Sequence, residues 1–143
     1  MPLTTLNAIS PIDGRYARQT RDLSRYFSEY GLIRYRVLVE VRWLQQLAAL
    51  EAVTEVPPLT PSGNAFLEAL ITNFNEQEAA AVKSHEAVTN HDVKAVEYYL
   101  KDKLVQHPEL KSIREFVHFG CTSEDINNLS YALMLSDSRK QVL

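Results

Sequence analysis

The fold is determined by residues 28–53, which read SEYGLIRYRVLVEVRWLQQLAALEAV. Apolar side chains recur there at intervals of three and four residues, which predicts a long helix. They form two adjacent stripes, so the apolar surface is wide enough to be buried on more than one side. We expect this helix to be the scaffold of the domain, with an oligomer contact as the alternative use of its surface. The stripes comprise Leu32, Tyr35, Val39, Trp43, Leu47 and Leu50, and Ile33, Val37, Val41, Leu44 and Ala48.

The rest of the chain predicts a series of shorter helices. Glycine and proline are scarce, with 4 and 6 residues, and no alternating Val/Ile/Thr run of strand length stands out. We expect Pro57 and Pro58 to end the long helix, and Thr60 and Asn75 are candidate N-caps of the two helices that follow. We therefore expect an all-α fold. The expected helices cover about residues 28–53, 61–74, 79–88, 93–107, 109–119 and 122–143.

Composition excludes several classes of protein. The 143 residues suit one domain, or one domain and the start of another, and 45% hydrophobic with 23% charged residues indicates a soluble globular chain. The net charge of −3 argues against nonspecific nucleic-acid binding. The single cysteine, Cys121, excludes an internal disulfide framework and fits a reducing cytosol. Residues 1–5 show no signal-peptide pattern and no apolar run reaches membrane-spanning length, so we expect a cytoplasmic protein without a membrane partner.

A candidate binding site lies where the last predicted helix begins. Thr122 and Ser123 follow the segment 116–121 and precede two acidic residues and an apolar run at helical spacing. This order is typical of a helix N-terminus, whose free N–H groups and positive dipole end favour an anionic ligand. His118, a few residues upstream, adds a group that titrates near neutral pH. The alternative is that Thr122 or Ser123 only caps the helix and that His118 is a packed or surface histidine.

Two further breaks in the helical pattern carry polar residues. Arg15 and Tyr16 follow a predicted turn, where an arginine could hold a phosphate or carboxylate; an ordinary surface arginine is the alternative. A second break holds Asn90, His91 and Asp92 at the start of another helix. Combined with the first site, these residues suit a ligand that carries phosphate and carboxylate groups. Neither the cysteine count nor the histidine spacing fits a zinc site, and we expect no metal or cofactor.

Three segments of the sequence resemble the adenylosuccinate lyases, in particular their bacterial branch. They are residues 10–16 (SPIDGRY), 89–100 (TNHDVKAVEYYL) and 117–128 (VHFGCTSEDINN). Their order and separation match the family, and the resemblance extends over essentially all 143 residues. It implies the all-α fold of the fumarase/aspartase superfamily. On that resemblance we expect an N-terminal helical domain at residues 1–121 and the start of the first long helix of a central helical bundle at 122–143.

The resemblance also implies an activity and a set of substrate-binding residues. The family removes fumarate by β-elimination from adenylosuccinate, giving AMP, and from the succinyl-carboxamide ribotide earlier in purine biosynthesis. A base takes a proton next to a carboxylate, and an acid protonates the departing nitrogen. Arg15 and Tyr16 match residues that hold the nucleotide phosphate, and Thr122 and Ser123 match the pair that binds the succinyl part. The other substrate-binding positions implied are Asn90, His91, Asp92 and His118.

The catalytic residues of the family are expected outside this chain. The resemblance implies a catalytic acid histidine and a base serine on a mobile Ser-Ser-x-Met-Pro-x-Lys loop, and neither motif occurs in residues 1–143. It also implies a homotetramer in which three subunits build each site. Because the last predicted helix has no stop signal, we expect a part of a longer lyase that is inactive alone. The alternatives are a stand-alone helical interaction module and a superfamily lyase with another fumarate-yielding substrate.

Overall fold

The computed structural model describes residues 4–142. The predictions made for residues 1–3 and for Leu143 lie outside this range. No strand occurs between residues 4 and 142, so the predicted all-α fold is confirmed. Two of the elements, η1 and η2, are 3₁₀ turns. The elements in chain order are α1 (Ala17–Thr20), η1 (Arg21–Leu23), α2 (Ser24–Phe27), α3 (Glu29–Ala49), α4 (Pro61–Thr72), α5 (Glu76–Thr89), α6 (Asp92–Leu104), α7 (Pro108–Ile113), η2 (Arg114–Phe116) and α8 (Ser123–Val142).

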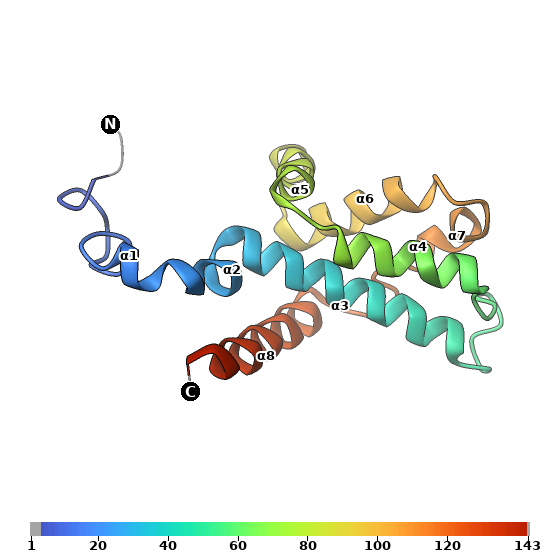
Figure 1. The fold of residues 1–143 in the computed structure, drawn as a ribbon. Coiled ribbons are helices and arrows are strands. Elements are labelled where there is room, and N and C mark those ends of the chain that lie inside the picture. Colours follow the sequence, from blue (N-terminus) through green and yellow to red (C-terminus); the bar gives the residue numbers. More distant parts are fainter. Residues whose placement is uncertain (1–3, 143) are drawn as a thin grey trace.

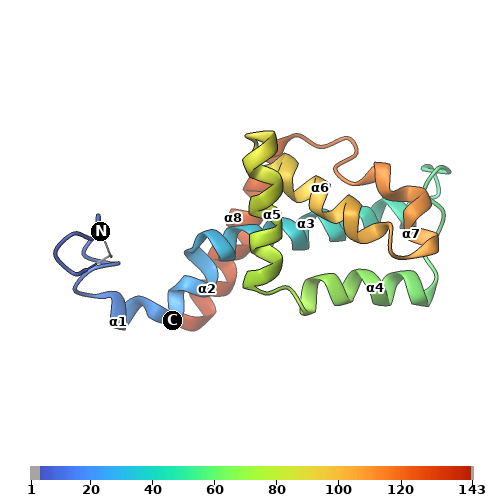
Figure 2. The same cartoon turned by 90° about the horizontal axis from the view of Figure 1, so that it is seen from above.

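Helix α3 is the centre of the fold (Figure 1). Helices α4, α5 and α6 pack on one side of it and α8 packs on the other, so burial on more than one side is confirmed. Figure 2 shows α5 crossing α3, and α4 and α6 lying on either side of α3. Each fully buried aliphatic side chain contributes roughly 1.5–3 kcal/mol. The main core cluster includes Ile33, Val37, Val41, Leu44, Leu47, Leu67, Val82, Val96, Leu100, Leu104 and Leu110.

The last helix, α8, runs antiparallel to α2 and α3. Near its start Asn127 accepts a hydrogen bond from Arg36 at 3.0 Å, and near its end Gln141 accepts one from Arg25 at 2.6 Å. A groove of about 630 Å³ lies between α3 and α8 and has a mainly apolar lining. No helix within residues 4–142 is both long and apolar enough to cross a membrane. Helix α8 also exposes four large apolar side chains, which are Leu129, Tyr131, Leu133 and Leu135.

The predicted helix starts are confirmed where a polar side chain caps the helix. Thr60 caps α4 by accepting the N–H of Gly63 at 3.1 Å. Asn75 caps α5 by accepting the N–H groups of Gln77 and Glu78 at 2.9 and 3.1 Å. In both cases the capping hydrogen bond stays within three residues, so the sequence contains all of the information that is needed to place the start.

The predicted end of the long helix is wrong. Helix α3 ends at Ala49 and not at Val53, because the backbone of Leu50 becomes extended and the chain turns. The turn brings Val56 into the core, where 1% of it is exposed. Val53 packs against the same cluster. Apolar residues therefore continue beyond the end of the helix, because the loop contributes to the core as well.

Candidate functional site

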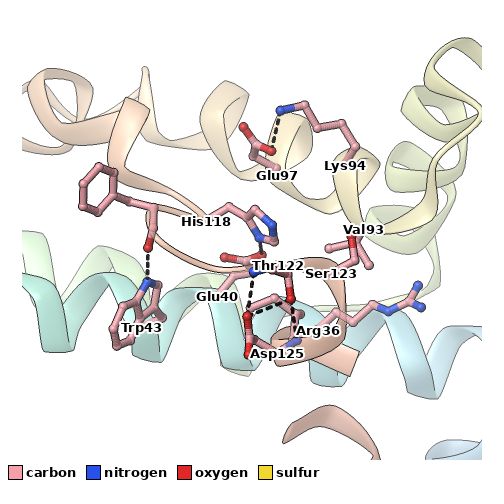
Figure 3. A network of polar contacts seen from close by, with 12 residues as sticks. Arg36, Glu40, Trp43, Val93, Lys94, Glu97, His118, Thr122, Ser123 and Asp125 are labelled. Carbon is pink, nitrogen blue, oxygen red and sulfur yellow. Dashed lines mark hydrogen bonds and ion pairs between the residues drawn. The ribbon is translucent and has the colours of Figure 1, made fainter. Parts of the chain in front are cut away.

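Five of the predicted binding residues lie beside the middle of α3. The loop after η2 carries His118 and Thr122, and the N-terminus of α8 carries Ser123 (Figure 3). The break between α5 and α6 carries His91, and Asp92 is the first residue of α6. Hydrogen bonds and ion pairs connect all three segments to α3. The fold therefore brings together two breaks that are separate in the sequence.

His118 is held by a buried acid on α3. Its Nδ1 atom lies 2.6 Å from Oε1 of Glu40, a residue with no exposed surface. Burial raises the pKa of Glu40, and the hydrogen bond with His118 reverses only part of that rise. Because Nδ1 is engaged, Nε2 is the ring nitrogen that can serve a ligand.

Replacing Glu40 with glutamine is expected to raise the free energy of unfolding of this chain at about pH 8 and to change it little at about pH 4. In the wild type, the folded state binds the Glu40 proton more tightly than the unfolded state does, and this contributes to the free energy of unfolding. The contribution is fully present below the ordinary pKa of 4.5 and is lost as the pH rises through the higher pKa of the folded state. Glutamine does not titrate and removes this loss. Urea unfolding at a series of pH values measures the effect, and a pH slope equal to that of the wild type would contradict it.

Thr122 and Asp125 form a reciprocal cap at the start of α8. The N–H and the hydroxyl of Thr122 donate to Oδ2 of Asp125 at 2.7 and 2.8 Å, and the Asp125 N–H donates to the Thr122 hydroxyl at 3.4 Å. This arrangement is a capping box with aspartate in place of glutamate. The hydrogen bonds from Thr122 lower the pKa of Asp125. Thr122 therefore caps the helix, which engages its hydroxyl, and the neighbouring Ser123 hydroxyl is better placed to meet a ligand.

His91 caps α6 through its ring. Its Nδ1 atom accepts the backbone N–H of Lys94 at 3.1 Å, so the proton of the neutral ring resides on Nε2. Nε2 lies 3.5 Å from the hydroxyl of Ser123. The N-termini of α6 and α8 thus meet at these two side chains. Both helix ends carry positive partial charge, which favours an anionic group between them.

Arg36 of α3 connects the starts of α6 and α8. Its Nη2 atom lies 2.6 Å from Oδ2 of Asp92, and its Nε atom donates to Oδ1 of Asn127 at 3.0 Å. Partial burial raises the pKa of Asp92, but the charge of Arg36 and the N–H of Val93 outweigh that effect and the pKa is lowered. Asp92 is therefore an ionised partner of Arg36, and this pair fixes the position of His91.

Arg15 and Tyr16 lie apart from this cluster. They precede α1 on the N-terminal arm, which extends away from the other helices in Figures 1 and 2. The Arg15 guanidinium lies over the ring of Tyr16, 4.9 Å from its centroid. Asn90 adjoins His91 and ends α5 with an exposed side chain and a left-handed backbone, at φ 50°. Within this chain, the predicted phosphate-binding pair and the predicted succinyl-binding residues are separate.

Two charged residues of the cluster, Arg36 and Glu40, were not predicted. They lie four residues apart in the middle of α3, with apolar core residues on either side. A charged residue that is buried requires a partner from elsewhere in the chain. The sequence of α3 therefore indicated that some of its charged residues are buried, because a helix that is buried on two sides cannot expose every charge in its middle turns.

The donors of the cluster suit an anionic organic ligand. They are imidazole, hydroxyl and backbone N–H groups at two helix N-termini. No group of three or more His, Cys, Asp or Glu side chains that could hold a metal ion occurs in the part of the chain that the structure describes. The arrangement can therefore bind carboxylate or phosphate through hydrogen bonds, with an imidazole available for proton transfer.

Comparison with known proteins identifies the class to which this chain belongs. A family model described as lyase matches residues 14–143, and the chain belongs to that lyase family. Its sequence is similar to the N-terminal part of adenylosuccinate lyases, which confirms the resemblance. It is 57% identical to the adenylosuccinate lyase of Haemophilus influenzae, 58% to that of Legionella pneumophila and 54% to that of Escherichia coli K12. Each match covers 100% of this chain and 31% of the relative, so the chain spans less than a third of those proteins.

Proposed function

We propose that the complete protein is an adenylosuccinate lyase. Its reactions would be the β-elimination of fumarate from adenylosuccinate, giving AMP, and from the succinyl-carboxamide ribotide of purine biosynthesis. The observation that carries the proposal is the identity of 54–58% to adenylosuccinate lyases over all 143 residues. This chain supplies part of the substrate site and none of the catalytic acid or base, which come from other parts of the protein.

The cluster beside α3 gives these residues specific roles in the proposal. Ser123 and His91, at two helix N-termini, bind a carboxylate of the succinyl group. During β-elimination negative charge develops next to that carboxylate, so donors that are already oriented toward it lower the barrier. His118 presents Nε2 to the same part of the substrate.

The N-terminal arm has a separate role in the proposal. Arg15 and Tyr16 hold the nucleotide phosphate, and Asn90, Asp92 and Thr122 complete the set of substrate-binding positions. The distance of the arm from the cluster is compatible with a site to which several subunits contribute (Figure 1).

The same proposal includes assembly and location. The protein is a cytoplasmic homotetramer that needs no cofactor and binds neither nucleic acid nor membrane. Residues 1–121 form its N-terminal domain, and residues 122–143 begin the central helical bundle. The apolar side chains that α8 exposes, Leu129 and Leu133 among them, support packing of this helix against other bundle helices.

The first test is fumarate release by the full-length protein, with the 143-residue chain assayed beside it. We expect release from adenylosuccinate by the full-length protein, in preference to argininosuccinate, malate or aspartate, and none by the isolated chain. Turnover by the isolated chain would overturn the assignment of the catalytic residues to other parts of the protein. A full-length protein that releases fumarate from another substrate only would overturn the assignment of the substrate.

Replacing Arg15 with alanine in the full-length protein is expected to weaken AMP binding by about 1.5–3 kcal/mol, the usual cost of losing a charge-assisted hydrogen bond. Calorimetric titration with AMP measures the change. Arg18→Ala is the matched control, because Arg18 is an exposed arginine in α1 of the same arm. Equal affinities of the wild type and Arg15→Ala would contradict the phosphate-binding role.

A further inference from the structure

The position of Glu40 is unfavourable for a charged side chain. The residue is wholly buried in the middle of α3, next to the core residues Val37 and Val41. One carboxylate oxygen, Oε1, meets His118, whereas Oε2 is buried without a hydrogen-bond partner among residues 4–142. A buried carboxylate with an unsatisfied oxygen costs free energy. Packing therefore does not explain why a glutamate occupies this position. The contact of Glu40 with His118 does explain it.

His118 lies in a loop with an unusual backbone. His118 has φ 65° and Gly120 has φ 72°, so two of three consecutive residues are left-handed. Helix α3 holds this loop at two points about one turn apart (Figure 3). Trp43 donates from Nε1 to the carbonyl oxygen of Phe119 at 2.8 Å, and Glu40 contacts the ring of His118. Trp43 therefore fixes the backbone of the loop, and Glu40 fixes the direction of the imidazole.

We propose that Glu40 is a positioning residue that orients the ring of His118 and occupies Nδ1, so that Nε2 faces the substrate. This inference rests on the proposed function, in which His118 lines the substrate site. An imidazole that acts through one nitrogen needs a partner at the other, because that partner selects the tautomer and stops the ring from rotating. Glu40 is that partner.

The other charged groups near Glu40 are already paired. Glu97 of α6 raises the pKa of Glu40, and its own carboxylate is bound by Lys94 at 2.8 Å and Lys101 at 3.0 Å. On the side of α8, the carboxylate of Asp125 accepts its hydrogen bonds from Thr122. Because these groups are paired with one another, the polar contact of α3 with the imidazole is the one between Glu40 and His118.

The test is a double-mutant cycle in the full-length protein, with Glu40→Leu, His118→Ala and the double variant. Steady-state kinetics with adenylosuccinate give kcat and KM for each protein. If Glu40 acts through His118, Glu40→Leu lowers kcat/KM by about 10- to 100-fold in the wild-type background. In the His118→Ala background it has no further effect, because the group through which it acts is absent.

Two further variants separate positioning from a structural role. Glu40→Gln retains an acceptor for Nδ1–H, so it should keep most of the wild-type kcat while the pH profile of kcat/KM changes. Glu68→Leu is the matched control, since Glu68 pairs with Arg42 of the same helix α3 but does not contact His118. It should leave kcat/KM unchanged. Thermal unfolding should show Glu40→Leu to be no less stable than the wild type, because the change removes a buried carboxylate with an unsatisfied oxygen, whereas the ring of His118 remains partly exposed to water.

The outcomes are distinct. An equal loss from Glu40→Leu in both backgrounds would overturn the proposal, as would nearly full activity of Glu40→Leu. If Glu40→Leu fails to fold, the activity of Glu40→Gln tests the proposal instead. Glu40→Gln activity as low as that of His118→Ala would refute a role of Glu40 in positioning. A wild-type protein that releases no fumarate would instead refute the proposed function, which the cycle does not test.

Discussion

Replacing Asp92 with alanine is expected to lower the free energy of unfolding of this chain by about 2 kcal/mol. This is less than the roughly 3–5 kcal/mol for breaking a fully buried ion pair from one side, because 47% of the Asp92 side chain is exposed. The change leaves Arg36, which is 3% exposed, with its hydrogen bond to Asn127 but without its counter-charge. It also removes an acid from the first turn of α6, where the helix dipole favours negative charge. Urea unfolding followed by circular dichroism measures the loss.

Asp102→Ala is the matched control for that experiment. Asp102 lies on the same helix but is 72% exposed and near its C-terminal end, and its contact with His85 is 3.3 Å long. We expect a change within about 0.5 kcal/mol, as for most exposed sites. The lowered pKa of Asp92 adds a pH dependence. The stability of the pair is present above the ordinary pKa of 3.8 and is lost as the pH falls through the lower pKa of the folded state. Equal effects of the two variants at neutral pH would show that the Arg36 pair contributes nothing.

Replacing Gly31 with alanine is expected to destabilise the chain by about 2–3 kcal/mol, the upper range for overpacking. An added Cβ would lie 2.5 Å from the carbonyl oxygen of Tyr26 and 3.0 Å from that of Arg25. Both are backbone atoms of α2 and cannot rotate away as the end of a side chain can. Relief of the clash requires α2 to move away from α3, which disturbs the contact of α2 with α8.

Gly63→Ala tests whether the cost comes from this backbone contact. Gly31 and Gly63 are both the third residue of a helix, and each donates its N–H to the capping hydroxyl at 3.1 Å. At Gly63 an added Cβ would meet the carboxylate of Glu109, which can rotate away and give up its hydrogen bonds with Thr60. That costs about 1 kcal/mol. A Gly31→Ala variant no less stable than Gly63→Ala would rule out the backbone contact as the cause.

Helix starts could be predicted because their signals are local. Thr60 and Asn75 accept hydrogen bonds from residues two or three positions away, so the sequence alone places them. The end of α3 at Ala49 could not be predicted, because it depends on where the core accommodates Val56. Gly31 near the start of α3 could be read as tolerated there, whereas the structure gives it a packing role against Tyr26.

The candidate site also contains residues that the sequence identifies and residues that it does not. The residues at breaks in the helical pattern, His91, His118 and Ser123, could be identified because polar residues at a helix start are visible in the sequence. The sequence indicates that Arg36 and Glu40 are buried charges on α3, but it does not identify their partners, which lie 91 and 78 residues away along the chain. The roles of the two residues depend on how α6, α8 and the loop after η2 pack on α3, which no local pattern specifies.

The contacts of α3 have a consequence for how this protein can change in length. Arg36 contacts the starts of α6 and α8. Glu40 and Trp43 contact the loop after η2, at the ring of His118 and the carbonyl oxygen of Phe119. An α-helix turns by about 100° per residue, so inserting or deleting one residue among the three would rotate at least one of them away from its segment. Exposed side chains of α3 can be exchanged one at a time, but the number of residues between Arg36 and Trp43 is fixed. A change of length is better tolerated at exposed loop positions such as Thr54 and Glu55, which lie outside the helices.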